Sequence, residues 1–315
     1  MKAKPFIKWV GGKGQLIEQL DDLLPADFDK WADVTYIEPF VGGGAMLFYM
    51  LQRYPNIKHT VINDINSDLI TCYKTVKCQH RELISSLSDI QSSYYALDSE
   101  ESRKEFYLRM RDRYNQKNLN SVDNTTLFFF LNRTCFNGLY RVNKKGQFNV
   151  PFGKYDRPCI CDEETIIADS KILQNVVVLN NDFEATINHA SGKTLFYFDP
   201  PYRPLSDTSS FNDYDKEPFN DAAQIRLKQY CDRVNNSGFS FMLSNSDCKG
   251  KNEKDFFFDS LYADYPIERV WASRNINANA SKRGKLTEIL VRNYNHTKST
   301  GEHKEFSFKS IRVAE

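Results

Sequence analysis

Residues 195–202 read Leu195-Phe196-Tyr197-Phe198-Asp199-Pro200-Pro201-Tyr202, an apolar and aromatic run that stops at an acid and two prolines. Proline cannot donate to a sheet ladder and its ring fixes φ, so this pattern predicts a buried strand followed by a stiff loop. A carboxylate, backbone carbonyls and the flat face of Tyr202 would then lie together at a sheet edge. That combination suits a planar ligand with an amino group, such as an adenine or cytosine turned out of a helix. The alternative is a strand that simply ends in a proline turn, and the motif alone favours neither.

The composition is that of an ordinary globular protein, because 41% of the 315 residues are hydrophobic and 26% are charged. No apolar run approaches the ~20 residues of a membrane span, and the first residues lack the apolar core of a signal peptide. We therefore expect a cytoplasmic protein with no membrane partner. Seven cysteines are scattered without C-x-x-C spacing, which predicts free thiols and no metal site. The net charge of +1 gives no global sign of a nucleic-acid partner, so only local patches can indicate one.

Two glycine-rich turns precede predicted helices in the first 60 residues. Residues 6–14 lead into an apolar helical pattern that ends at Pro25, and they place backbone N–H groups and a lysine where anions are favoured. This turn lacks P-loop spacing, which disfavours nucleotide-triphosphate hydrolysis. The second turn, Glu38-Pro39-Phe40-Val41-Gly42-Gly43-Gly44, lies between a strand at 35–37 and a helix from Ala45 to about Tyr54. Strand, glycine turn and helix form the first half of a nucleotide-binding βαβ unit.

Two acids at predicted strand ends complete a candidate cofactor site. Asp64 ends the strand that begins at Thr60, where such folds hold a ribose diol. The turn is not G-x-G-x-x-G, and Glu38 would repel a pyrophosphate, so a cofactor with an amino-acid end fits better than NAD. Asp182 follows a predicted strand at 176–179 and could accept a hydrogen bond from the amino group of the cofactor's adenine, or could cap a helix.

The middle of the chain changes character after a helical region. Residues 67–116 are predicted to be helical, and Asp123 is predicted to cap a helix that runs through Leu131. Residues 132–155 then interleave basic residues with aromatics and amides, and Lys144-Lys145-Gly146 is flanked as the turn of a hairpin would be. Basic groups suit phosphates, arginine and asparagine suit base edges, and an aromatic ring can fill a vacated stack. We favour this interpretation over a merely solvated basic hairpin.

The remaining residues predict further strands and helices of an α/β sheet. The polar loop at 203–218 is long enough to be a lid. The predicted elements that follow are a helix at 222–234, a strand at 239–243, a helix at 253–262 and strands at 267–271 and 286–291, with a basic loop at 274–285.

Four ordered motifs resemble the Dam-type DNA adenine-N6 methyltransferases, the alpha-group enzymes of the D12 class. These motifs are residues 6–13, residues 38–44, the segment 137–153 and the Asp-Pro-Pro-Tyr at 199–202, and the resemblance runs from Phe6 to about Tyr294. It implies an α/β fold with a doubly wound, Rossmann-like methyltransferase sheet. Residues 1–66 and 176–315 would form the catalytic domain, and residues 67–175 would form an inserted, mainly helical target-recognition domain with a β-hairpin. The implied cofactor is S-adenosylmethionine.

The resemblance also assigns roles to residues. The catalytic residues would be Asp199, Pro200 and Tyr202, and the cofactor residues would be Trp9, Lys13, Glu38, Phe40, Gly42, Gly44, Asp64, Asp182 and Phe183. The residues on DNA would be Lys8, Arg133, Phe136, Asn137, Leu139, Arg141, Pro151, Lys154 and Tyr155. Arg141 matches an arginine that reads guanine, Leu139 and Pro151 match contacts to a thymine methyl, and Lys8 matches a reader of the first base pair, which implies GATC. Phe136 matches the aromatic that enters the space left by a flipped base.

The sequence thus predicts a site-specific enzyme that methylates the N6 amine of adenine in double-stranded DNA. A cognate restriction endonuclease is a further candidate partner. The alternatives are a DNA-binding module without catalysis, a small-molecule methyltransferase or dinucleotide enzyme, and an enzyme that methylates cytosine N4. The glycine-rich region lacks the Pro-Cys motif that cytosine-C5 chemistry needs for its thiolate. Residues 249–255 have the character of a small polar insertion, the tail after His296 lies outside the match, and neither receives a role.

Overall fold

The computed structural model describes residues 2–9, 11, 13–14, 16–203, 219–250, 252–273 and 285–294. The predicted lid beyond Arg203, the basic loop up to residue 284 and the tail after His296 lie outside the described residues.

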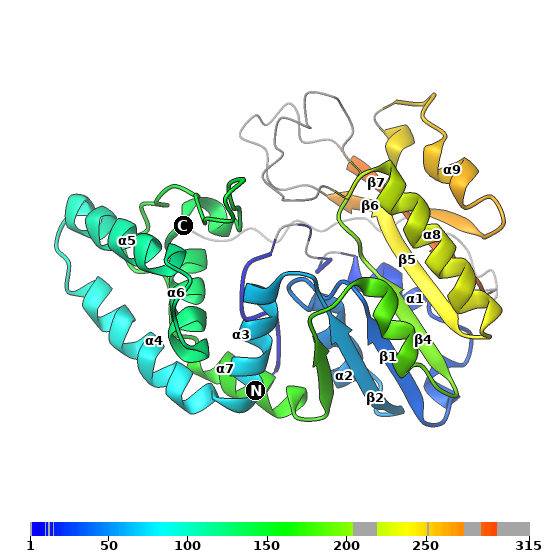
Figure 1. Ribbon diagram of the computed structural model, residues 1–315. Helices are drawn as coiled ribbons and strands as arrows, with labels where there is room; N and C mark the ends of the chain where they lie inside the picture. The colour runs from blue at the N-terminus through cyan, green and yellow to red at the C-terminus, as the bar shows by residue number, and fades with distance from the viewer. Residues whose placement is uncertain are drawn as a thin grey trace, which may run out of the picture.

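A seven-stranded sheet forms the centre of the described fold, which confirms the predicted α/β class (Figure 1). Its strand order is β3-β2-β1-β4-β5-β7-β6, and the first five strands in that order are parallel while β7 is antiparallel to β5 and β6. The strands are β1 (Val34–Glu38), β2 (Ile57–Asn63), β3 (Val176–Leu179), β4 (Thr194–Phe198), β5 (Ser240–Ser246), β6 (Ile267–Ser273) and β7 (Lys285–Arg292). The order reverses between β1 and β4, and ligands of open α/β sheets bind at the carboxyl ends of strands at such a point.

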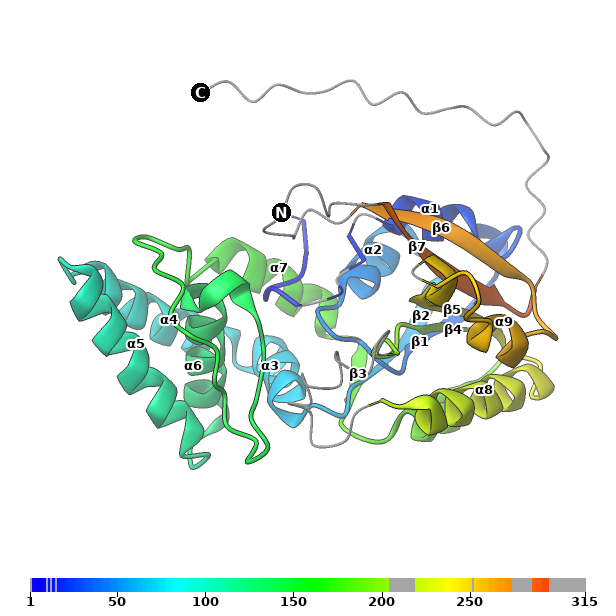
Figure 2. The same ribbon diagram turned by 90° about the horizontal axis from the view of Figure 1, so that it is seen from above.

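Helices cover both faces of this sheet, so the central strand β4 is buried throughout. Leu195 and Tyr197 face the core that includes α1 (Ile17–Asp22) and α2 (Ala45–Arg53), whereas Phe196 and Phe198 face α8 (Asp221–Asn236). Figure 2 shows α8 on one side of the sheet and α1 and α2 on the other. Side chains along a strand point alternately to the two faces of the sheet. Because helices cover both faces at β4, nearly every residue of this strand has to be apolar.

A second group of helices lies beside the β3 edge in both views (Figures 1 and 2). It contains α3 (Ser67–Cys78), α4 (His80–Tyr95), α5 (Glu100–Asn115), α6 (Ser121–Thr134) and α7 (Glu163–Leu173). Tyr94, Tyr107, Tyr114 and Phe130 are fully buried among these helices. The Tyr107 hydroxyl donates to the Val150 carbonyl at 2.7 Å, so the helices support the segment that follows α6.

Several predicted boundaries need correction. Residues 67–116 are helical as predicted, and the structure divides them into three helices, with breaks at Gln79 and after Tyr95. Asp123 is not the cap of α6, because the Asn120 side chain accepts from the Asp123 N–H at 2.9 Å and starts the helix three residues earlier. The helix predicted at 253–262 is shorter, since α9 spans Phe257–Leu261. The hairpin is present as a tight turn with one bridge, between Val142 and Phe148.

All seven cysteines are free thiols. Within the described ranges, no helix has the length and apolar character that crossing a membrane would require.

Candidate active site and nucleic-acid interface

The glycine turn and the Asp-Pro-Pro-Tyr motif meet where the strand order reverses. Glu38 is the last residue of β1, and Asp199 directly follows the neighbouring strand β4. Because adjacent parallel strands end at one edge, the two motifs become neighbours although 160 residues separate them in the chain. We call residues 199–203 the acceptor loop.

A buried lysine joins this loop to the N-terminal turn. Lys13 is only 3% exposed, and its Nζ lies 3.1 Å from Asp199 Oδ1 and 2.7 Å from Glu288 Oε2. The ammonium also hydrogen bonds to the Tyr202 hydroxyl and lies 4.5 Å from the centroid of that ring. Burial raises the pKa of Asp199 to about 6, with the Lys13 cation opposing the rise. The carboxyl is therefore ionised at neutral pH and can accept a hydrogen bond.

Sequence reasoning missed Glu288, which lies on β7 and completes this ion cluster. The available signal was the acid Glu288 directly before the apolar run Ile289-Leu290-Val291 of a predicted strand, because a charge in a buried strand needs a partner.

The Glu38 carboxyl lies at the end of β1, at the same edge of the sheet. It is 2% exposed and accepts a hydrogen bond from the Tyr36 hydroxyl at 2.7 Å. Burial raises the pKa of Glu38 to about 8, and the charge of Asp199 adds to the rise.

The second glycine turn is closed by two aromatic side chains. A Cβ on Gly43 would lie 2.9 Å from Trp9 Cβ, and one on Gly44 would lie 2.5 Å from the Tyr73 hydroxyl. Tyr73 is fully buried and donates to the Gly42 carbonyl at 2.9 Å. The turn therefore needs glycines for close packing, and φ of +75° at Gly44 adds a conformational reason.

Asp64 lies at the same sheet edge, directly after β2. Its carboxylate accepts from the backbone N–H of Gly42 at 3.1 Å and of Asn66 at 2.9 Å. The next residue, Ile65, was not predicted as a site residue, yet it is a 77% exposed apolar side chain. The buried Asn63 side chain bonds to the Pro39 and Asn181 carbonyls, which ties the loops after β1 and β3 together.

Asp182 and Phe183 follow β3 and face the glycine turn through an aromatic pair. The Phe183 and Phe40 ring centroids lie 5.2 Å apart. Asp182 caps the short helix at 183–189 by accepting from the Glu184 N–H at 3.0 Å, and it also pairs with Arg226. The alternative role as a helix cap is thus confirmed, while a cofactor contact stays a prediction.

The predicted DNA residues gather after α6. Phe136 is 51% exposed, and its N–H donates to the Pro151 carbonyl at 2.9 Å, which brings these two predicted contacts together. Asn137, with φ of +55°, is also exposed. The Lys8 ammonium lies 5.5 Å from the Tyr155 ring centroid. An N-terminal residue and two distant segments therefore form one surface.

Asn132 fixes this surface to the N-terminal segment and was not predicted. Its buried side chain accepts from the Lys8 N–H at 2.8 Å and donates to the carbonyls of Lys8 and Gly138, each at 2.9 Å. A Cβ on Gly138 would lie 2.4 Å from Lys8 Cδ. The Asn132 amide and the close approach at Gly138 therefore fix the position of Lys8 relative to Leu139, the residue that follows Gly138.

The other predicted DNA residues have contacts within the protein. Arg141 donates to the Asn149 side chain at 2.8 Å across the hairpin, and Arg133 donates to the Phe6 carbonyl at 2.8 Å. Lys154 pairs with Glu100 at 2.7 Å, and both side chains are largely exposed. Such exposed pairs contribute little to stability and can exchange for phosphate partners.

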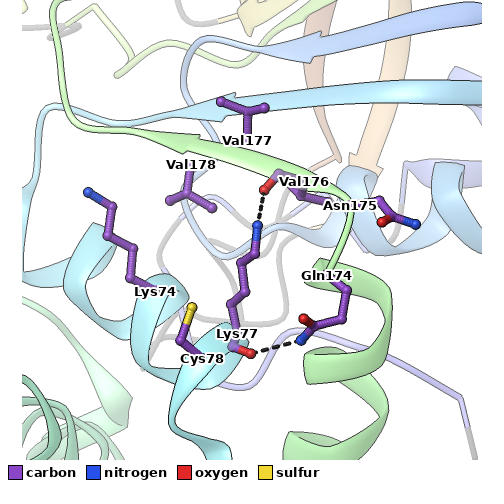
Figure 3. Close-up of a pocket in the computed structure, with 8 residues that line it drawn as sticks. All are labelled: Lys74, Lys77, Cys78, Gln174, Asn175, Val176, Val177 and Val178. Atoms are coloured by element: carbon purple, nitrogen blue, oxygen red, sulfur yellow. Dashed lines mark hydrogen bonds between the residues drawn. The ribbon is translucent and has the colours of Figure 1, made fainter.

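A groove of about 460 Å³ lies elsewhere, beside the edge strand β3. Lys77 Nζ donates to the Val176 carbonyl at 2.7 Å, and the Gln174 amide donates to the Lys77 carbonyl at 2.8 Å (Figure 3). None of the predicted site residues lines this groove, so it is not the candidate site. The part of the chain that the structure describes has no group of three or more His, Cys, Asp or Glu that could hold a metal.

Comparison with known proteins identifies the family. The model of the D12 class N6 adenine-specific DNA methyltransferases matches residues 9–276. The chain belongs to this family. It is therefore an adenine-specific DNA methyltransferase, and the match favours this class over a DNA-binding module, a small-molecule enzyme or a cytosine-N4 enzyme.

Named relatives of this D12-class methyltransferase cover nearly its whole length. It is 47% identical to the type II methyltransferase M.MjaIII of Methanocaldococcus jannaschii, over 93% of this chain and 100% of the relative. It is 38% identical to the type II methyltransferase M1.LlaDCHI of Lactococcus lactis subsp. cremoris, over 93% and 96%. It is 32% identical to a DNA adenine methylase of Vibrio cholerae, over 92% and 96%.

Proposed function

We propose that this methyltransferase transfers the methyl group of S-adenosylmethionine to the N6 amine of an adenine flipped out of GATC in duplex DNA. The observation that carries the proposal is the meeting of the glycine turn with Asp199 and Tyr202 at the point where the strand order reverses. A methyl donor and its acceptor amine must lie in line within one site.

The residues at this edge fit S-adenosylmethionine. Asp64 would hold the ribose hydroxyls, and Ile65 offers an exposed apolar surface beside it. Asp182 and Phe183 would receive the adenine, and Trp9 and Lys13 would form the wall of that pocket. The glycine turn beneath it would be lined by Glu38, Phe40, Gly42 and Gly44. When bound, the cofactor supplies an electrophilic sulfonium methyl, so the protein needs no covalent nucleophile.

The acceptor loop would then orient and polarise the amine. The lone pair of adenine N6 is delocalised into the ring, which makes it a poor nucleophile. Asp199 and the Pro200 carbonyl would accept hydrogen bonds from the two N–H groups, localising the lone pair toward the methyl, while Tyr202 stacks on the ring. Lys13 keeps Asp199 ionised for this role, since its ammonium lies 3.1 Å away.

GATC specificity rests on the recognition surface and its resemblance to the Dam-type enzymes. Arg141 would read a guanine, Lys8 the first base pair, and Leu139 and Pro151 the thymine methyl. Phe136 would fill the vacated stack. Arg133, Lys154 and Tyr155 would contact the DNA backbone, and Asn137 would contact the DNA beside Phe136. We propose residues 67–175 as the recognition domain and residues 1–66 with 176–315 as the catalytic domain.

The first experiment incubates unmethylated plasmid with the protein and S-adenosylmethionine and maps modified bases by single-molecule sequencing. Methyladenine confined to GATC is expected. Methyladenine at another sequence would refute the base assignments of Lys8, Leu139, Arg141 and Pro151 while leaving the chemistry intact. Asp199→Ala is the matched control and should give no product while binding the cofactor normally.

A cognate restriction endonuclease is a further proposal, supported by the type II methyltransferases among the relatives. Expression of the protein in a host that lacks GATC methylation should protect that host's DNA from an endonuclease blocked by GATC methylation. Continued cutting at every site would argue against a protective role.

A further inference from the structure

The acceptor loop ends in an arginine whose contacts the proposed function does not use. Arg203 directly follows Tyr202, and its side chain is 19% exposed. Nε and Nη2 donate to the two carboxylate oxygens of Asp221 at 2.7 and 3.1 Å, and Nη1 donates to Asp255 Oδ2 at 2.8 Å. The guanidinium carbon also lies 4.3 Å from the centroid of the Phe257 ring. One planar group thus engages two carboxylates and a ring.

The two carboxylates belong to different elements. Asp221 is the first residue of α8, and Asp255 lies just before α9 in the segment to which sequence analysis gave no role. Asp255 is itself fixed, because its N–H donates to the Asn252 carbonyl at 2.8 Å and its carboxylate accepts from the Phe257 N–H at 3.1 Å. Helices α8 and α9 lie side by side in both views (Figures 1 and 2). Arg203 therefore bonds to two neighbouring elements at once.

A second contact holds the backbone of the same loop. Gln224 lies one turn after Asp221, is fully buried, and donates to the Pro201 carbonyl at 3.1 Å. Its Oε1 accepts from the Asn245 amide at 3.1 Å, and Asn245 is also fully buried. The first turn of α8 thus contacts the loop on both sides of Tyr202, through Pro201 and through Arg203.

Bidentate arginine pairs fix direction as well as distance, because the guanidinium is planar and its donors are rigid. A displacement of about 1 Å in a residue that orients substrate can cost about 100-fold in rate. Two prolines make the loop stiff, so a constraint at Arg203 is transmitted to Asp199 and Tyr202.

We propose that Arg203, Asp221 and Asp255 form a clamp that positions the acceptor loop for methyl transfer. The proposal rests on the proposed roles of Asp199 and Tyr202. It gives the unassigned segment before α9 a function, which is to support the loop that receives the target base. Arg203 acts through Tyr202 and Asp199, so it is a positioning residue.

The test compares single-turnover methylation of a duplex containing GATC by the wild type, Arg203→Gln, Arg203→Lys and Asp255→Asn. Arg203→Gln is expected to lower the transfer rate about 10- to 100-fold. Arg203→Lys should give an intermediate rate, because an ammonium can keep one carboxylate but not the fork. The dissociation constants for S-adenosylmethionine and for duplex should stay within about twofold, since only the acceptor geometry changes.

Asp259→Asn is the matched control. Asp259 lies on α9 and pairs with Lys249 and with Arg269 of β6, so Asp259→Asn removes ion pairs from the same region while leaving the pairs of Arg203 with Asp221 and Asp255 in place. The proposal predicts a rate near that of the wild type for Asp259→Asn. It also predicts that Arg203→Gln combined with Asp255→Asn is no slower than Arg203→Gln alone, since both changes break one interaction.

Three outcomes would overturn the clamp. These are a rate for Arg203→Gln within twofold of the wild type, an equal loss for Asp259→Asn, or additive losses in the double variant. A wild type that binds cofactor and DNA but yields no methyladenine would instead refute the proposed function. Thermal unfolding of each variant identifies any that fails to fold, and Asp255→Asn then decides the case, because it leaves the acceptor loop sequence intact.

Discussion

Gly44→Ala tests whether close packing holds the second glycine turn in place. An added Cβ would lie 2.5 Å from the buried Tyr73 hydroxyl, where no atom can be accommodated without movement. Gly238→Ala is the matched control, because its φ of +81° resembles the +75° of Gly44, while nothing lies within 4 Å of its added Cβ. The pair therefore separates crowding from backbone strain.

The two variants should differ clearly in stability. A left-handed backbone costs a non-glycine residue about 1 to 2 kcal/mol, and this applies to both positions. Crowding at Gly44 adds about 1 to 3 kcal/mol, and displacing Tyr73 from the Gly42 carbonyl adds about 1 kcal/mol. The expected loss in the free energy of unfolding is about 3 to 6 kcal/mol for Gly44→Ala and about 1 to 2 kcal/mol for Gly238→Ala.

Urea unfolding followed by circular dichroism measures these losses, and calorimetry measures the affinity for S-adenosylmethionine. Affinity should fall for Gly44→Ala only, because Gly238 lies between α8 and β5, at the amino end of a parallel strand, whereas the turn lies at the carboxyl ends of the parallel strands. Equal losses of stability in the two variants would refute the packing argument. Unchanged cofactor affinity in a folded Gly44→Ala protein would refute the placement of the cofactor at this turn.

Three further predictions concern charge and base recognition. Burial raises the pKa of Asp199 to about 6, and the ionised carboxylate is a much stronger acceptor for the amine than the protonated carboxyl. The transfer rate should therefore fall about tenfold per pH unit below 6. A flat single-turnover profile from pH 5 to 8 would contradict this. Burial raises the pKa of Glu38 to about 8, above the ordinary value of about 4.3. Between these two pH values the folded protein holds a proton on Glu38 that the unfolded chain releases, so the free energy of unfolding falls as the pH rises. Glu38→Gln should reduce this fall, measured as the difference between urea midpoints at pH 6 and pH 8. An equal difference in the wild type and the variant would contradict the argument. Arg141→Ala should reduce the preference for the correct base at one base pair of the DNA site by about 1 to 3 kcal/mol in competition binding assays. Lys144→Ala should instead weaken DNA binding evenly across sequences. An unchanged base preference in the Arg141 variant would exclude base readout by Arg141.

Local patterns predicted the sheet and its key motifs. The run before Asp199 had to be a doubly buried strand because it lacks polar alternation, and Pro200 and Pro201 had to end it. The glycines before Ala45 correctly predicted the turn between β1 and α2, and Asp64 was correctly placed at the end of β2, since each depends on neighbours along the chain. The bond from the Gly42 N–H to Asp64 was not predicted. Helix boundaries were less accurate: α6 begins at an asparagine cap that competed with Asp123 for the same role.

Contacts between distant segments were decided only by the tertiary structure. The resemblance gave Lys13 a place in the wall of the cofactor pocket, which stays a proposal. Only the fold shows that its ammonium lies beside Asp199 and Glu288, which are 186 and 275 residues away. In the same way Asn132 is bonded to Lys8, and Arg203 to Asp255. A residue type and its spacing specify which bonds a side chain can make. Which partner it meets depends on how the strands and helices pack, because a buried charge or amide bonds to whatever the fold brings within reach.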